Sequence, residues 1–177
     1  MPQPTTRPLL FLDVDGPLIP FGVPAQRLDP QLVPQGAWHS EPGNPLLARL
    51  DSGHGARLLA LGCELVWATT WMADANDEIA PRIGLPVLPV VVWPDTDEEE
   101  IVDGLHWKTQ ELINWAAGRH FIWVDDEITE LDRRWISAHH HGRALLHRVD
   151  PLRGLNDTDF KIMGRWLATL RRTEAQT

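Results

Sequence analysis

The first apolar run of the chain ends in two aspartates spaced one residue apart. The segment from Leu9 to Gly16 reads LLFLDVDG, so Asp13 and Asp15 follow four hydrophobic residues. Residues i and i+2 of a strand point the same way, so both carboxylates should project toward one point at the strand's carboxyl end. Two anions that close repel unless a cation or a shared proton separates them. We therefore expect a metal-assisted site in which one carboxylate is a nucleophile or ligand and the other an acid/base.

Length and composition are those of a globular domain, and we expect one domain over residues 1–177. The chain is 43% hydrophobic and 23% charged, and no run reaches the length of a membrane span. The single cysteine, Cys63, can form no internal disulfide, which favours a reducing cytoplasm. The net charge of −9 disfavours non-specific binding to nucleic acid. It does not exclude an anionic substrate, because a bound divalent cation can dominate the local field.

Short β-rich runs alternate with helical stretches along the chain. This rhythm predicts a Rossmann-like α/β three-layer sandwich, with a five-stranded parallel sheet and helices on both faces. Pro89 falls within the third strand, which suggests an edge position. The predicted strands are Leu9–Val14, Glu64–Thr69, Val87–Trp93, His120–Asp125 and Ala144–Val149, and the predicted helices are Pro45–Leu61, Asn76–Ile83, Gly104–Ala117, Thr129–Ser137 and Asp157–Arg171.

The stretch from Pro17 to Pro45 carries seven prolines and no clear periodicity. It is either an irregular connection or a flap over the site, and its position directly after the acidic pair favours the flap. Trp38 and Trp71 flank this stretch and the second strand, so either could contact a substrate.

Three more polar features are expected at the same edge of the sheet. Thr69 and Thr70 end the second strand, where hydroxyl and backbone N–H groups can hold a phosphoryl oxygen. Lys108 interrupts an apolar helical stripe near a helix N-terminus, which in a βαβ unit lies at the carboxyl edge of the strands. It should therefore reach the aspartates, unless it extends to solvent. The fourth strand ends in Asp125 and Asp126, repeating the opening pattern.

In this order, these residues resemble the motifs of the haloacid dehalogenase-like (HAD) superfamily of phosphatases. The motifs are Asp13-Val14-Asp15-Gly16, Thr69, Lys108 and the pair Asp125-Asp126. Receiver domains of two-component signalling use similar residues, but with the acidic pair first and the lysine last, so the order here excludes that class. Short intervals between the motifs leave no room for a large cap domain, which implies a capless or minimal-cap type. Capless relatives often act on bulky substrates.

The resemblance implies a role for each residue. Asp13 would attack phosphorus and form an aspartyl-phosphate, and Asp15 would act as general acid and then general base. Mg²⁺ would be held by the Asp13 carboxylate, the Asp15 carbonyl and Asp125, with Asp126 bound through water or orienting the site. Thr69 and Lys108 would bind the phosphoryl oxygens, with Thr70 and Gly16 as further substrate-binding residues.

Three functions agree with these features. The favoured one is a Mg²⁺-dependent phosphomonoester hydrolase acting on a phosphorylated small molecule or a larger phosphoester. The second is a phosphotransferase or nucleic-acid end phosphatase of the same fold. It would need a basic groove that Arg133-Arg134 and Arg171-Arg172 are too sparse to indicate. The third is a catalytically idle binding or regulatory module.

Overall fold

The structure is a computed structural model that describes residues 7–22, 44–94 and 104–174. Four parallel strands form one sheet in the order β2-β1-β3-β4: β1 Leu9–Leu12, β2 Glu64–Trp67, β3 Phe121–Asp125 and β4 Ala144–Arg148. The helices are the 3-10 helix η2 Pro45–Arg49, α1 His54–Ala60, the π-helix η3 Ala75–Ile79, α2 Ala80–Ile83, α3 Thr109–Ala116, α4 Glu130–His139 and α5 Asp157–Glu174.

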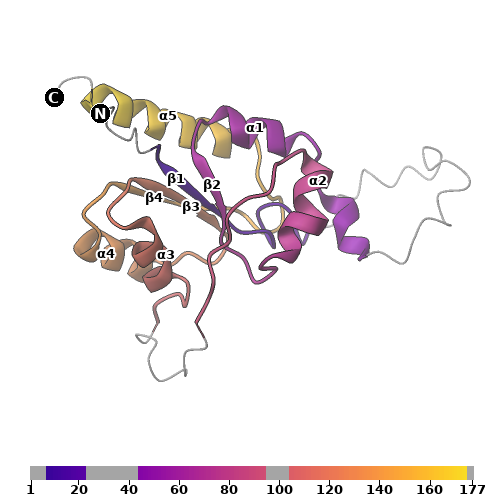
Figure 1. Ribbon diagram of the computed structural model, residues 1–177, viewed down its shortest axis with the longest axis horizontal. Coiled ribbons are helices and arrows are strands. Elements are labelled where there is room, and N and C mark those ends of the chain that lie inside the picture. The colour runs from indigo at the N-terminus through magenta and orange to yellow at the C-terminus, as the bar shows by residue number, and fades with distance from the viewer. Residues whose placement is uncertain (1–6, 23–43, 95–103, 175–177) are drawn as a thin grey trace, which may run out of the picture.

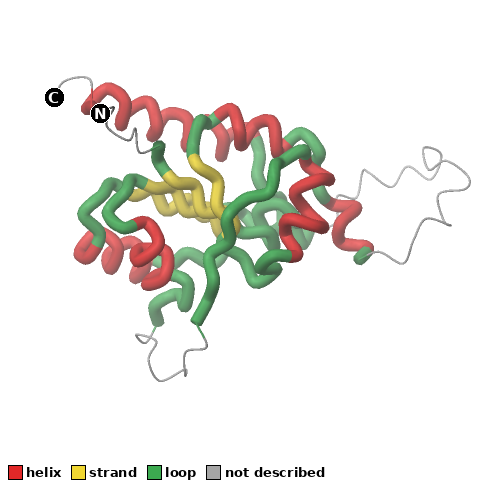
Figure 2. Tube along the Cα trace, viewed as in Figure 1, coloured by secondary structure: helices red, strands yellow, loops and turns green. Residues whose placement is uncertain are grey.

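Helices cover both faces of the sheet, as the sequence predicts (Figures 1 and 2). Alternate residues of β1 enter two separate cores, because successive strand residues point to opposite faces. Leu10 and Leu12 pack into the core formed with α1, α2 and α5, and Leu9 and Phe11 pack into the core formed with α3 and α4. All four side chains are fully buried. An unbroken apolar run is therefore what this central strand requires.

The prediction of a fifth strand over Val87–Trp93 is wrong, because the described sheet has four strands. Only an isolated parallel bridge joins Val90 to Trp67 on β2, where the Pro89 carbonyl accepts from Trp67 and the Val91 N–H donates back. Pro89 has no N–H to extend the ladder. The side chains of Val87 and Val92 are 81% and 70% exposed, so neither packs into a core of the described structure. The segment nevertheless lies beside β2 at the sheet edge.

Two predicted helices are shorter than expected. The stretch 45–61 divides into η2 and α1, because the Asp51 side chain accepts from the Gly53 N–H in a local turn that competes with the helix. The predicted helix at 104–117 begins only at Thr109, with Lys108 as its N-cap residue. This later start leaves residues 104–108 in a non-helical approach to the sheet edge.

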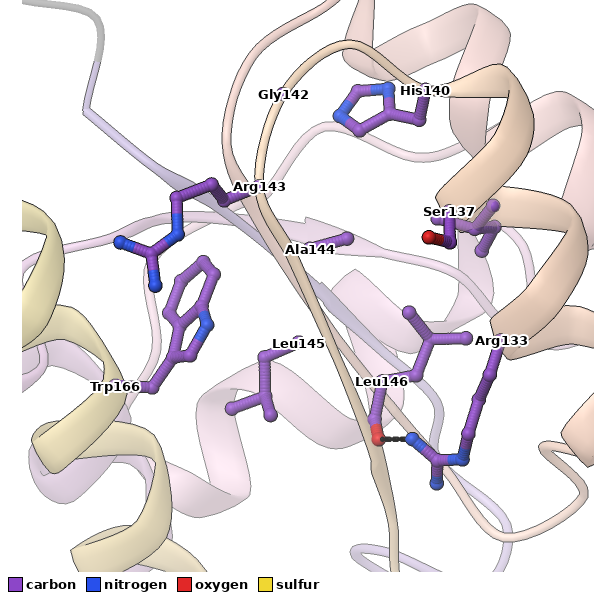
Figure 3. Close-up of a pocket in the computed structure, with 10 residues that line it drawn as sticks. Arg133, Ser137, His140, Gly142, Arg143, Ala144, Leu145, Leu146 and Trp166 are labelled. Atoms are coloured by element: carbon purple, nitrogen blue, oxygen red, sulfur yellow. Dashed lines mark hydrogen bonds between the residues drawn. The ribbon is translucent and has the colours of Figure 1, made fainter.

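The outer edge of the sheet is β4, which lies between α4 and α5. A pocket beside this edge is lined by residues of both helices and of β4 (Figure 3). Arg133 on α4 reaches across it and donates to the Leu146 carbonyl oxygen. Trp166 on α5 lies on the opposite side of the pocket.

Most of the expected flap, including Trp38, lies at residues 23–43, outside the described residues. The first residues of this stretch, 17–22, are described and contact the rest of the domain. The Phe21 N–H donates to the Pro151 carbonyl oxygen, and the Arg49 side chain donates to the Pro20 carbonyl oxygen. Within the described ranges, no helix combines the length and apolar character that crossing a bilayer requires.

Candidate active site

Strand register places Asp13 and Asp125 side by side. Leu12 on β1 is in register with Val124 on β3, so the residues that follow them, Asp13 and Asp125, lie next to each other. The Asp13 N–H donates to the Val124 carbonyl oxygen at 3.0 Å, which continues the ladder to this point. Asp13 is 8% exposed and Asp125 is fully buried. Two carboxylates thus meet at the carboxyl edge of adjacent strands, where parallel α/β sheets bind their ligands.

Lys108 lies between these two carboxylates. Its Nζ donates to Asp13 Oδ2 and to Asp125 Oδ2, both at 2.8 Å, and the residue is 3% exposed. The lysine therefore points into the acidic cluster and does not extend to solvent. Asp125 is fixed further by the Trp123 indole N–H at 3.2 Å and by the Glu127 N–H at 2.9 Å.

Burial and neighbouring charges shift the pKa values of the side chains in this cluster. Burial raises the pKa of Asp13 to about 7, an effect that the Lys108 charge opposes and the Asp125 charge increases. Burial alone would lower the pKa of Lys108, but the two aspartates outweigh it and raise that pKa above its usual value. Burial and then the Asp125 charge also raise the pKa of Asp126. The cluster holds more negative charge than one lysine neutralises, so a further cation would stabilise it.

The cluster offers oxygen ligands for such a cation. Carboxylate oxygens of Asp13, Asp125 and Asp126 lie within 4.8 Å of one another. Hard oxygen donors in this number suit Mg²⁺, which is bound by one or two carboxylates together with waters and substrate phosphate. Gly16 leaves room for the third carboxylate, because a Cβ at Gly16 would lie 2.6 Å from Asp126 Cγ. The residues present therefore fit a divalent metal.

The Asp15 carboxylate is held by a tryptophan outside the group of three carboxylates. The Trp71 indole N–H donates to Asp15 Oδ2 at 2.9 Å. The Asp15 carboxylate is not part of the three-carboxylate group, although the sequence suggested that both acids of the pair point to one place. The strand ends at Leu12, so strand periodicity no longer applies at Asp15. This separation suits different roles for the two acids.

The predicted threonines follow the end of β2 by two and three residues. Thr69 is fully buried, and its hydroxyl oxygen accepts from the Trp71 N–H at 3.3 Å. Thr70 is exposed. In the described part of the chain, neither hydroxyl hydrogen-bonds to Lys108 or Asp13, so the structure does not join the threonines to the charged cluster directly.

Sequence reasoning missed Asp132, which anchors the segment that carries Lys108. Asp132 on α4 is fully buried. Its Oδ1 accepts from the His106 N–H at 2.8 Å and from the Thr109 hydroxyl at 2.7 Å. Its Oδ2 accepts from the Thr129 N–H at 2.7 Å and hydroxyl at 2.6 Å, in a capping box. Its spacing from Thr129 indicates the cap, but no local pattern signals the contacts across 23 and 26 residues.

Comparison with known proteins connects this geometry to one family. Residues 9–160 match the family described as the HAD domain in Swiss Army Knife RNA repair proteins. No curated protein and no solved structure gives a significant match. The matched range contains all four motifs and the described sheet. The chain therefore belongs to this family of HAD domains, which are enzymes of the phosphatase and phosphotransferase type.

Proposed function

We propose that the protein is a Mg²⁺-dependent phosphomonoester hydrolase that acts through an aspartyl-phosphate on Asp13. The observation that carries this proposal is the Lys108 Nζ, buried at 2.8 Å from both Asp13 and Asp125 at the carboxyl edge of the sheet. A buried cation beside a carboxylate nucleophile favours the ionised form of that carboxylate and attracts an anionic phosphoryl group.

The proposed hydrolysis has two steps, formation of the aspartyl-phosphate and its hydrolysis. In the first, an Asp13 oxygen bonds to phosphorus as the ester P–O bond breaks, and the leaving oxygen takes a proton from Asp15. In the second, Asp15 takes a proton from water, whose oxygen attacks phosphorus and releases phosphate and the free Asp13 carboxylate. The Trp71 N–H holds Asp15 in place for both transfers. Asp13, Asp125 and Asp126 would hold Mg²⁺, which would supply charge stabilisation of the phosphoryl oxygens.

The substrate class that the family favours is a nucleic-acid end. The matching family is described by its occurrence in RNA repair proteins, so the terminal phosphate of an RNA strand is the phosphoester that we propose. A phosphotransferase would use the same first step and pass the phosphoryl group from Asp13 to an acceptor other than water.

Phosphate release from a small phosphomonoester, with and without Mg²⁺, tests the chemistry. We expect metal-dependent turnover in the wild type and loss of turnover in Asp13→Asn. Asp77→Asn is the matched control, because Asp77 is an exposed aspartate on η3 outside the site. Thermal unfolding with Mg²⁺ and beryllofluoride adds a readout that needs no turnover. Absence of both turnover and stabilisation would contradict the proposal and favour an idle binding module.

A further inference from the structure

Trp107 is partly exposed beside the candidate active site. It is 38% exposed, whereas the other tryptophans in the described ranges are buried or half-buried. More than a third of the residue's surface thus stays open to solvent next to the candidate catalytic cluster, where it is available to a ligand.

Two neighbouring rings hold Trp107 in place. Trp93 contacts it edge to face, with ring centroids 4.8 Å apart and an interplanar angle of 76°. The Trp93 indole N–H in turn donates to the Thr69 carbonyl oxygen at 3.1 Å, which ties this pair to the end of β2. The His106 ring lies 5.7 Å from Trp107 at an interplanar angle of 25°. The indole is therefore ordered before any ligand binds.

The same indole borders the phosphoryl site. The Lys108 Nζ lies 5.4 Å from the centroid of the Trp107 ring and 2.8 Å from the Asp13 carboxylate. A phosphate bound at Lys108 and Asp13 would carry the adjoining part of its substrate next to Trp107.

We propose that Trp107 is a stacking platform for the base of the terminal nucleotide of a single-stranded RNA whose end phosphate is bound at Lys108 and Asp13. This inference rests on the proposed function and specifies its substrate. Single-stranded nucleic acids are recognised largely by stacking of unpaired bases on aromatic side chains. Stacking also suits an acidic chain of net charge −9, because a protein with few basic contacts gains little affinity from the phosphate backbone.

Two short RNA oligonucleotides with the same terminal phosphate test the proposal, one with a base on the last nucleotide and one with an abasic last nucleotide. Stacking of one base corresponds to roughly a 5- to 150-fold preference in kcat/KM for the base-bearing end. Trp107→Leu keeps apolar bulk without an aromatic ring and should abolish this preference, so that the two ends react with equal kcat/KM. Trp107→Phe should keep a substantial part of the preference.

Trp166→Ala is a control at a tryptophan outside the candidate active site, because Trp166 lines the pocket beside β4 (Figure 3). It should leave the preference intact. Equal rates for the two ends in the wild type, or a preference that survives Trp107→Leu, would overturn the proposal. A preference lost in Trp166→Ala and retained in Trp107→Leu would also overturn it.

A binding measurement separates this proposal from the proposed hydrolase function. Fluorescence anisotropy of both labelled oligonucleotides, with Mg²⁺ and the Asp13→Asn protein, reports base-dependent affinity without turnover. Stacking predicts that the Asp13→Asn protein binds the base-bearing end more tightly and that the double variant with Trp107→Leu loses this difference. This outcome supports stacking even if the wild type releases no phosphate. Equal binding of the two ends contradicts stacking, even if the wild type is an active phosphatase.

Discussion

Replacing Asp132 with asparagine should destabilise the fold by about 2–4 kcal/mol. Both Asp132 oxygens accept two hydrogen bonds, each pairing one backbone N–H with one threonine hydroxyl. In Asp132→Asn, one oxygen becomes an NH₂ group. The hydroxyl on that side can rotate and accept from it, but the backbone N–H, of His106 or of Thr129, is left without an acceptor.

The magnitude follows from these contacts. A hydrogen bond to a charged group contributes about 1.5–3 kcal/mol, and the remaining bonds lose their charge assistance. Urea unfolding followed by circular dichroism measures the difference, and a shift in Tm of roughly 5–15 °C should accompany it. Asp77→Asn is the control, since an exposed aspartate outside such a network should change stability by at most about 0.5 kcal/mol.

The pH dependence gives a second check. Burial alone would raise the pKa of Asp132, but the hydrogen bonds from Thr129, Thr109 and His106 outweigh it and lower the pKa below 3.8. A carboxylate with a lowered folded-state pKa stabilises the protein above its unfolded-state pKa, and this contribution is lost as pH falls through the folded-state value. The difference in free energy of unfolding between wild type and Asp132→Asn should therefore be constant from pH 7 to about 5 and become smaller below about pH 4. A variant as stable as wild type at pH 7 would refute this reasoning.

Three further outcomes concern other parts of the structure. Gly16→Ala should lose turnover and at least about 1 kcal/mol of stability, because φ of Gly16 is +84° and the new Cβ would meet Asp126. Gly164→Ala is the control, because a Cβ there meets open space, and it should lose neither. Phosphate release and urea unfolding measure the two effects. Burial lowers the pKa of His54, so the free energy of unfolding should fall as pH drops below about 6.5. His54→Gln should lose less stability over this range, which urea unfolding at pH 7.5 and 5.5 measures. Burial raises the pKa of the Cys63 thiol to about 11, so a disulfide reagent at pH 8 should react with it rapidly only after unfolding.

The four observed strands could be predicted from sequence because each is a short apolar run with a clear end. The predicted starts of β1, β2 and β4 agree with the structure, and the predicted ends extend one or two residues too far. The segment 87–93 has the same apolar character but two of its valines face solvent, and Pro89 limits its pairing. Residue type alone does not distinguish a strand from an extended segment that makes one bridge.

The charged cluster was predictable for a related reason. Register brings residues at the carboxyl ends of parallel strands together, so Asp13 after β1 and the pair Asp125 and Asp126 at the end of β3 indicate a shared location from the sequence alone. The contacts of Trp71 with Asp15 and of Asp132 with His106 join residues 56 and 26 positions apart. They depend on how loops and helices pack above the sheet, which no local pattern encodes. The position of Trp107 beside Lys108 follows likewise from the late start of α3.

The exposed edge of β4 carries a consequence for self-association. An edge strand presents unpaired N–H and C=O groups that can template a strand from another molecule. Here Arg133 occupies the Leu146 carbonyl oxygen, and Arg143 and Arg148 stand just before β4 and at its end. Two copies approaching along this edge would bring like charges together and would have to break the Arg133 hydrogen bond. The arginines of an otherwise acidic chain thus work against edge-to-edge aggregation along β4.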